Sequence, residues 1–313
     1  SDRYRTYQNS FIIADPTSAW ILETAGHRWV ASAVGDRGAI GNLLTLTEPW
    51  DTGSPGVREH AEAQGWWQPS GGFAAAYQNP ETDLSTRSCR LDRAREILGG
   101  YQPGVIVPDM IAGLRDHDDH HLPTRAQPLP TLCMHGNPAF EGETAASIVV
   151  EIRPDRPRLL TTTIWTAFGS PCLSVFRPVY PFQVGLPERL AIGNGAFDPD
   201  SPWWIFEHLQ RLVARAPGSA GFVRATFSDL QNAFFRDTAA AEAKAAEHLD
   251  AGDEGAAIAT LRDLVDRTTE RAIAVAEQLT IDLPACSDYA PIPELVAYWD
   301  AHDARVMPTP SRA

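Results

Sequence analysis

Two groups of strand-like apolar runs, separated by helical and loop-like sequence, limit most strongly what this chain can fold into. The first group lies between Phe11 and Leu46 and comprises FIIAD, AWILETA, RWVASAV and AIGNLLTLT. The second group, SIVVEIR and LLTTTIW, covers 147–153 and 159–165. Short runs rich in branched and aromatic residues favour strands. Because helical patterns lie between and after these groups, the sequence predicts an α+β fold with segregated layers.

Tight turns connect consecutive runs within each group. Asp15 and Pro16 stand where a type I turn prefers them, between the first two runs, and PDRPR joins the last two. Apolar residues occupy consecutive positions rather than strictly alternating, a pattern typical of a sheet covered on both faces. We therefore expect three or four sequential antiparallel strands in the first group and a hairpin in the second.

The remainder of the chain is predicted to be helix or loop. A Ser201-Pro202 pair provides a helix start, and Gly99-Gly100 provides a helix stop. The predicted helices cover 85–98, 107–116, 202–215, 221–249, 254–279 and 292–306. Polar, Gly-rich and Pro-rich composition predicts loops over 48–82 and 117–131.

Charge and cysteine content exclude several classes of protein. The 313 residues carry a formal net charge of −14, which argues against nucleic acid and anionic membrane surfaces as partners. No apolar run approaches the roughly 20 residues of a membrane span, and no signal-peptide pattern is visible. The four cysteines are far apart, which fits a reducing compartment and argues against a disulfide framework or a structural zinc site. We expect a cytoplasmic protein without metal or cofactor.

Three short stretches offer candidate chemistry, each with a plain alternative. Cys133 and His135 in TLCMHGN would share one face of a strand and could form a thiol–imidazole pair, or Cys133 is a buried, unreactive cysteine. The HDDHH run at 117–121 offers metal ligands but lies in a polar loop, where a solvated segment is the alternative. Ser1 is either an N-terminal nucleophile or the residue left by a cleavage.

Asn42 is the most informative polar residue of the first group. It stands among apolar neighbours in AIGNLLTL, where a carboxamide must be hydrogen-bonded or reserved for a ligand. A side-chain amide directed into a site can stabilise an oxyanion. The alternative is a structural asparagine at a strand bulge.

Seven stretches in sequence order together resemble one family. They are NSFIIAD, ETAGHRWVA, GNLLTL, LRDH, TLCMHG, CLSVFRPVY and SPWWIFEHLQRLV, and they span most of residues 7–215. Their order and character are similar to the dipeptidase A and secernin family of cysteine-type N-terminal-nucleophile (Ntn) hydrolases. The resemblance implies an αββα sandwich formed by residues 1–215, incomplete in this chain, with 216–313 as a helical C-terminal segment packed on it. It also implies an amidohydrolase that cleaves dipeptides or small amides through a cysteine acyl-enzyme.

The chain departs from the family pattern at its start. In the family the nucleophilic cysteine opens the mature protein, whereas no cysteine lies near Ser1. We therefore expect the nucleophile on an N-terminal fragment or small subunit, in an assembly that could include further copies. The expected alternatives are a non-catalytic binding or scaffold subunit with the same fold, and an acyltransferase.

The resemblance also assigns roles to residues of this chain. Asn42 matches the family's oxyanion asparagine, and Arg90 matches an arginine beside the nucleophile that favours its thiolate, with Arg87 and Arg93 as competing candidates. Three further residues are candidates for lining the substrate pocket: His27, His135 and Asn137.

Overall fold

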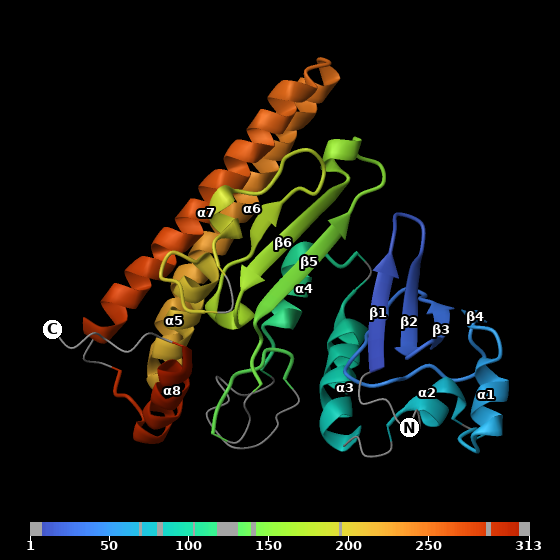
Figure 1. The fold of residues 1–313 in the computed structure, drawn as a ribbon. Helices are drawn as coiled ribbons and strands as arrows, with labels where there is room; N and C mark the ends of the chain where they lie inside the picture. The colour runs from blue at the N-terminus through green and yellow to red at the C-terminus, as the bar shows by residue number, and fades with distance from the viewer. Residues whose placement is uncertain are drawn as a thin grey trace. The chain divides into compact units, whose positions relative to one another are not determined.

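A computed structural model describes most of the chain (Figure 1). The described residues are 8–68, 71–79, 84–102, 104–117, 131–138, 142–193, 196–285 and 289–306, without the side chains of 84–87 and 285. The chain forms two compact units: an N-terminal unit, residues 1–103 with 130–132, and a C-terminal unit, residues 104–129 with 133–313. Both combine helices with an antiparallel sheet, so the predicted α+β class is confirmed. The αββα sandwich and the division at residue 215 stay predictions.

A four-stranded antiparallel sheet of order β1-β2-β3-β4 forms the N-terminal unit together with three helices. Strands β1 (Gln8–Ala14), β2 (Ala19–Ala25) and β3 (Arg28–Ala33) confirm the first three predicted runs. The short strand β4 (Thr52–Gly53) pairs with β3. The register pairs Ile12 with Ile21 and Leu22 with Ala31, which makes β1 the edge strand.

Two predictions for this unit are wrong. AIGNLLTLT is no strand: only an isolated bridge between Gly41 and Leu43 forms there, because its backbone is hydrogen-bonded by side chains. The predicted loop over 48–82 contains helices α1 (Val57–Ala63) and α2 (Gly72–Tyr77). Both follow glycines and are short, so no helical periodicity could develop in the sequence. Helix α3 (Leu84–Gly100) confirms the predicted helix over 85–98.

The C-terminal unit contains a three-stranded antiparallel sheet of order β5-β6-β7. The predicted hairpin is confirmed as β5 (Ala146–Ile152) and β6 (Thr162–Phe168), and β7 (Arg177–Val179) adds a strand that the sequence did not predict. Short 3₁₀ turns, η1 (Arg158–Leu160) and η2 (Pro171–Leu173), precede β6 and β7, and η3 (Glu188–Ala191) follows.

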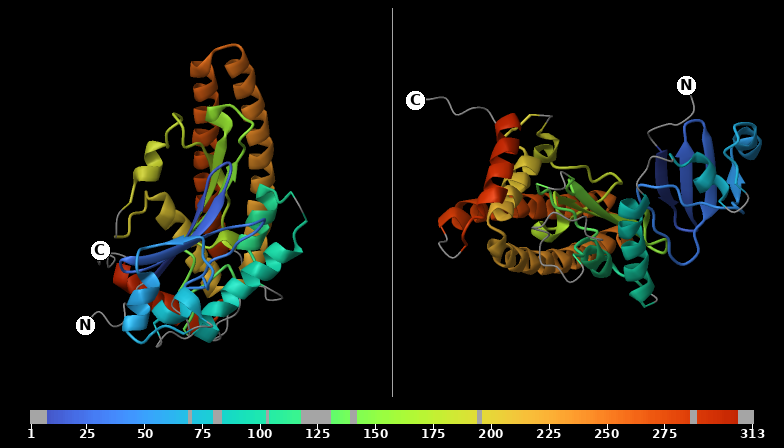
Figure 2. Two further views of the ribbon diagram at one scale, coloured as in Figure 1. Left: turned by 90° about the vertical axis from the view of Figure 1, so that its right-hand side faces the viewer. Right: turned by 90° about the horizontal axis from the view of Figure 1, so that it is seen from below.

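Helices cover one face of this sheet (Figures 1 and 2). They are α4 (Val107–Leu114), α5 (Pro202–Arg215), α6 (Ala220–Asp250) and α7 (Glu254–Ala285), with the 3₁₀ turn η4 (Pro217–Ser219) before α6. Helix α8 (Pro293–Val306) packs on α5. Helices α6 and α7 run side by side and both contact β7. The predicted helices of this unit are thus confirmed.

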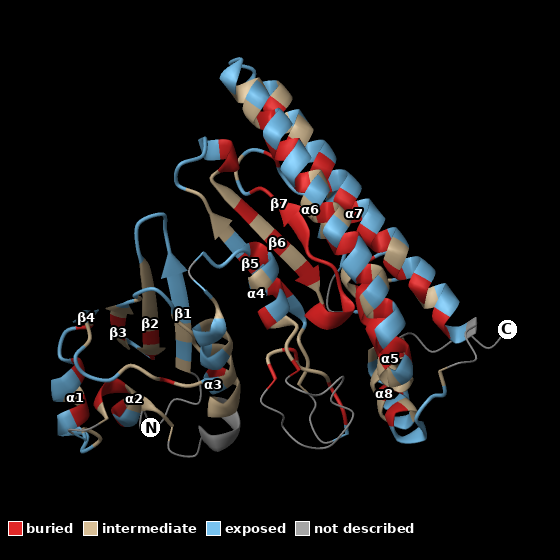
Figure 3. Cartoon of the chain, turned by 180° about the vertical axis from the view of Figure 1, so that it is seen from behind, coloured by how far each residue is buried: buried red, intermediate tan, exposed pale blue. Residues whose placement is uncertain are grey.

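Burial alternates along β5 and β6 of the C-terminal sheet, whereas β7 is buried throughout (Figure 3). Val149 of β5 and Trp165 of β6 are buried and belong to the same apolar core as Phe206 and Phe227 of α5 and α6. On β5, by contrast, Ile148 and Val150 are 60% and 51% exposed. The sheet therefore buries one face and presents apolar side chains on the other.

A buried arginine attaches α8 to α5. Arg211 forms ion pairs with Glu207 at 2.6 Å and Asp303 at 2.5 Å, and its guanidinium lies over the rings of Trp204 and Trp299. Removing one partner from a buried network of this kind leaves an unpaired charge and is strongly destabilising.

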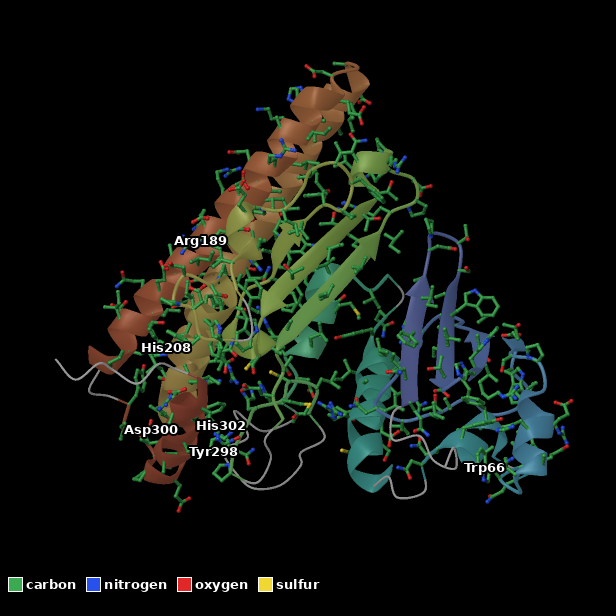
Figure 4. All side chains as sticks on the ribbon, viewed as in Figure 1. Trp66, Arg189, His208, Tyr298, Asp300 and His302 are labelled. Carbon is green, nitrogen blue, oxygen red and sulfur yellow. The ribbon has the colours of Figure 1, made fainter. Side chains whose placement is uncertain are left out.

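Neighbouring side chains extend this contact between α5 and α8. Arg215 reaches Asp303 at 2.5 Å and Asp300 at 3.0 Å. Figure 4 labels Asp300, Tyr298 and His302 on α8, and the ring of Tyr298 packs on that of His302. The helix pair is therefore joined by charged and aromatic contacts together.

Glu143 makes the stability of the C-terminal unit depend on pH. Burial and the nearby carboxylate of Glu207 raise the pKa of Glu143 to about 8. The folded state therefore keeps a proton that the unfolded state releases near pH 4.5, so stability falls as the pH rises from 4.5 to about 8. We expect Glu143→Gln, which cannot ionise, to remove this loss, at about 1.4 kcal/mol for each pKa unit.

Urea unfolding at pH 5, 7 and 9 measures this difference. Glu247→Gln changes an exposed glutamate of α6 and serves as the matched control, with the wild-type dependence expected. An unchanged pH dependence in the Glu143→Gln variant would contradict the assignment.

Candidate functional site

The segment that carries Asn42 is held by a buried carboxylate of β2. Glu23 is fully buried, and it accepts hydrogen bonds from the backbone N–H of Thr45 at 2.6 Å and of Leu46 at 2.9 Å. Thr45 Oγ1 donates a further bond at 2.7 Å, and Leu44 N–H donates to Gln78 Oε1 at 2.8 Å. Burial raises the pKa of Glu23, against these hydrogen bonds. Along 44–46, side chains thus accept the backbone hydrogen bonds that a neighbouring strand would accept in a sheet.

Two residues that the sequence predicted to be catalytic, Asn42 and Arg90, contact each other. Arg90 Nη2 donates to Asn42 Oδ1 at 3.3 Å, from helix α3. Gly41 permits this approach, since a Cβ at this position would lie 3.3 Å from Leu91 Cβ. Asn42 is exposed, contrary to its predicted place among apolar strand neighbours, because 39–47 is not part of the sheet. An exposed carboxamide whose oxygen faces an arginine can direct its N–H₂ group to a ligand.

The other predicted residues of the N-terminal unit lie elsewhere. His27 is exposed in the turn between β2 and β3. Arg93 forms an ion pair with Glu96 at 2.9 Å on the surface of α3, whereas the side chain of Arg87 is outside the described part. Among the three arginines considered, Arg90 is the one for which a contact with Asn42 is described.

The C-terminal unit contains a cluster of two histidines and two cysteines, hereafter the Cys–His cluster: His117, Cys133, His135 and Cys172. Their ligand atoms all lie within 4.8 Å of one another. His117 follows α4, Cys133 and His135 belong to the segment 131–138, and Cys172 lies in η2. Three side chains are buried and His135 is half-buried.

Several backbone contacts hold the segments of the cluster together. Arg115 donates through Nε to Pro171 O at 2.9 Å and through Nη2 to Ser174 O at 3.0 Å, which fixes both sides of Cys172. Cys133 N–H donates to Asp116 O at 3.2 Å. Asn137, which the sequence predicted to line a pocket, is buried and donates to His135 O at 3.3 Å. In this position Asn137 supports the segment that carries His135.

The two thiols ionise differently. Burial raises the pKa of Cys133, and its hydrogen bond with Cys172 adds to this rise. Burial also opposes ionisation of Cys172, but hydrogen bonds from Cys133, His117 and His135 lower its pKa well below the ordinary value. A cavity of about 260 Å³, lined by His117 and Cys172 with Arg115 and Arg224, borders the cluster.

Sequence reasoning found the parts of this cluster but not the whole. The stretches HDDHH and TLCMHGN were separate candidates, and the structure brings the first histidine of one to the Cys133–His135 pair of the other. Cys172 comes from a third segment. No spacing in the sequence could have shown this, because the three segments meet only through tertiary packing. Residues 118–121 of HDDHH lie outside the described residues.

Part of the chain matches a known protein family. The model of peptidase family C69 matches residues 141–220, a stretch that includes β5, β6, β7, η2 and α5. The match confirms the predicted resemblance to the dipeptidase A and secernin family and indicates a peptidase. Among the described helices, none combines the length and the apolar character that a membrane span requires.

Proposed function

We propose, from the match of residues 141–220 to peptidase family C69, that this chain is the larger part of a cysteine-type Ntn peptidase. Its substrate would be a dipeptide or another small amide. The observation that carries the proposal for this chain is the contact between Arg90 Nη2 and Asn42 Oδ1. These two residues are 48 positions apart in the sequence and lie within hydrogen-bonding distance. The family resemblance predicts a role for each of them at one reaction centre.

The nucleophile in this proposal is the thiol of a cysteine that opens a fragment or small subunit outside residues 1–313. Its own α-amine accepts the thiol proton, and the thiolate attacks the scissile carbonyl carbon. The amine then returns the proton to the leaving nitrogen as the C–N bond breaks. Water attacks the resulting thioester, which releases the acid and regenerates the thiol.

Asn42 and Arg90 act on two different charges of this reaction. The N–H₂ group of Asn42 donates to the oxyanion of the tetrahedral intermediate, a contribution of this type being worth about 10²–10³-fold in kcat. In this proposal Arg90 orients the amide by donating to Oδ1, which leaves Nδ2 as the donor to the oxyanion. The positive charge of Arg90 also favours the thiolate over the thiol. His27 remains a proposed contact to substrate. The predicted contacts of His135 and Asn137 with substrate stay predictions, because these two residues belong to the C-terminal unit.

An exposed apolar edge strand supports the proposal that a second polypeptide binds this chain. Phe11, Ile12 and Ile13 of edge strand β1 are 46%, 48% and 53% exposed. An uncovered apolar edge strand readily pairs with another segment, which would complete the sheet and cover these side chains. We propose that the segment carrying the cysteine binds here.

Native mass spectrometry of the purified assembly tests the two-chain arrangement. We expect the 34.2 kDa chain together with a second polypeptide whose first residue is cysteine. A hydrolytically active species that contains this chain alone would contradict the proposal. A complex without turnover would favour the scaffold alternative, and aminolysis in preference to hydrolysis would favour the acyltransferase.

A further inference from the structure

We infer that the Cys–His cluster of the C-terminal unit, His117, Cys133, His135 and Cys172, binds a Zn²⁺ ion. The inference is independent of the proposed peptidase reaction, since Asn42 and Arg90 belong to the other unit. Two cysteines and two histidines are a ligand set that zinc takes in structural sites.

The spacing of the ligand atoms fits a tetrahedral ion. Zinc binds sulfur at about 2.3 Å and imidazole nitrogen at about 2.0–2.1 Å, so tetrahedral geometry places two nitrogens about 3.3 Å apart and sulfur about 3.6 Å from nitrogen. Nε2 of His117 and Nε2 of His135 are separated by 3.1 Å. From Nε2 of His135, Cys133 Sγ lies at 3.5 Å and Cys172 Sγ at 3.3 Å. These three separations are close to the edges of a zinc tetrahedron.

Hydrogen bonding alone does not account for the position of His135. Its Nε2 faces His117 Nε2, Cys133 Sγ and Cys172 Sγ together. A neutral ring nitrogen has either one hydrogen or one lone pair, so it can satisfy one of these partners. A cation at the centre of the four atoms satisfies all of them at once, with the hydrogen of His117 on Nδ1, so that the 3.4 Å approach of Arg224 Nη2 to Nδ1 is a contact and not a hydrogen bond. This convergence on one nitrogen is the strongest observation for a bound ion.

The surroundings are those of a closed metal site. Cys133 is fully buried, and Cys172 and His117 are 6% and 7% exposed. Structural zinc sites take all four ligands from the protein and keep the ion away from water. Arg115 fixes the backbone on both sides of Cys172, and Asn137 holds the carbonyl of His135. Such support of ligand orientation is a regular feature of metal sites.

Two other uses of the cluster give different experimental results. In one, Cys172 is a thiolate nucleophile with His135 as its base, beside the cavity that Arg115 and Arg224 border. In the other, Cys133 and Cys172 form a disulfide under oxidising conditions. Neither use requires that Nε2 of His117 and Nε2 of His135 approach each other.

Metal analysis of the full protein tests the inference. After unfolding in chelator and refolding with Zn²⁺ under reducing conditions, we expect one zinc per chain by mass-spectrometric elemental analysis. Refolding with Co²⁺ should give the visible absorption of a tetrahedral thiolate site. Cys133→Ser and Cys172→Ser each remove one sulfur ligand. Each should therefore weaken zinc binding by more than the roughly 10–100-fold loss that follows substitution of residues around the ligands. Cys89→Ser, which alters a cysteine of the N-terminal unit, is the matched control and should keep one zinc.

A second measurement needs no variant and therefore no assumption about folding. Alkylation of the native protein should modify Cys89 with and without zinc, whereas zinc should protect Cys133 and Cys172. Absence of zinc after refolding with all thiols reduced would overturn the inference. So would zinc binding unchanged by both serine variants, or alkylation of Cys172 that zinc does not slow.

Discussion

Replacing Asn42 by alanine is expected to lower kcat of the complete assembly by about 10²–10³-fold, since one donor to the oxyanion is lost. The substrate KM should change little, because the developing negative charge exists only in the transition state. The exposed position of Asn42 predicts that the variant folds normally. Steady-state kinetics with a dipeptide substrate measures the effect.

Asn42→Asp separates the two roles of this side chain. Aspartate keeps an oxygen that accepts from Arg90 Nη2, but it lacks the N–H₂ donor. If Asn42 donates to the oxyanion, the aspartate variant must lose at least as much activity as the alanine variant. An active aspartate variant would mean that Asn42 only positions Arg90. Asn232→Ala, at an exposed asparagine of α6, is the matched control and should retain wild-type kcat.

Replacing Glu242 by glutamine is expected to cost the C-terminal unit about 3–5 kcal/mol of unfolding free energy. Glu242 of α6 pairs with Arg153 through two bonds of 2.5 and 2.7 Å. Its Oε1 also accepts from Tyr180 OH at 2.8 Å and from Thr163 Oγ1 at 3.0 Å. These contacts attach α6 to the ends of β5 and β7 and to the start of β6. Without the carboxylate, the half-buried guanidinium of Arg153 keeps its charge but loses its main partner.

The stability that this network contributes depends on pH. Burial alone would raise the pKa of Glu242, but the hydrogen bonds and charge of Arg153 hold it below its ordinary value. This stabilisation is present above the ordinary pKa of 4.5 and is lost as the pH falls through the lower pKa of the folded state. Urea unfolding at pH 7 and at pH 3 should therefore differ more for the wild type than for Glu242→Gln.

Two comparisons make the Glu242 result specific. Asp263→Ala removes an exposed ion pair with Arg267 on α7 and should cost less than about 1 kcal/mol. Arg153→Met combined with Glu242→Leu removes both charges and should recover part of the stability that the single change loses. A cost for Glu242→Gln no larger than that of Asp263→Ala would show that the network contributes little.

The sequence predicts elements well where a local pattern decides their structure. Strands β1 to β3, the β5–β6 hairpin and the long helices α5 to α7 each follow from apolar periodicity and turn residues. The segment around Asn42 was wrongly predicted, because a buried carboxylate on β2 satisfies its backbone in place of a strand. Nothing local to 39–47 indicates that Glu23 takes this position.

The other features that could not be predicted from the sequence depend on contacts between residues far apart in the chain. Arg153 and Glu242 are 89 positions apart, and neither has a local feature that marks it as a partner of the other. The Cys–His cluster likewise draws its ligands from three separate segments. By contrast, the contact between Asn42 and Arg90 joins two residues to which the family resemblance assigns expected roles at one reaction centre.

Covalent labelling of the native assembly tests the central claim most directly. A dipeptide carrying a thiol-reactive carbon electrophile should label the residue that attacks the substrate, and free substrate should protect it. Mass spectrometry of the digested product then locates the adduct. The proposed function predicts an adduct on the N-terminal cysteine of a polypeptide outside residues 1–313, with Cys133 and Cys172 unlabelled. A substrate-protected adduct on Cys172 or Cys133, or no protected adduct at all, would contradict it.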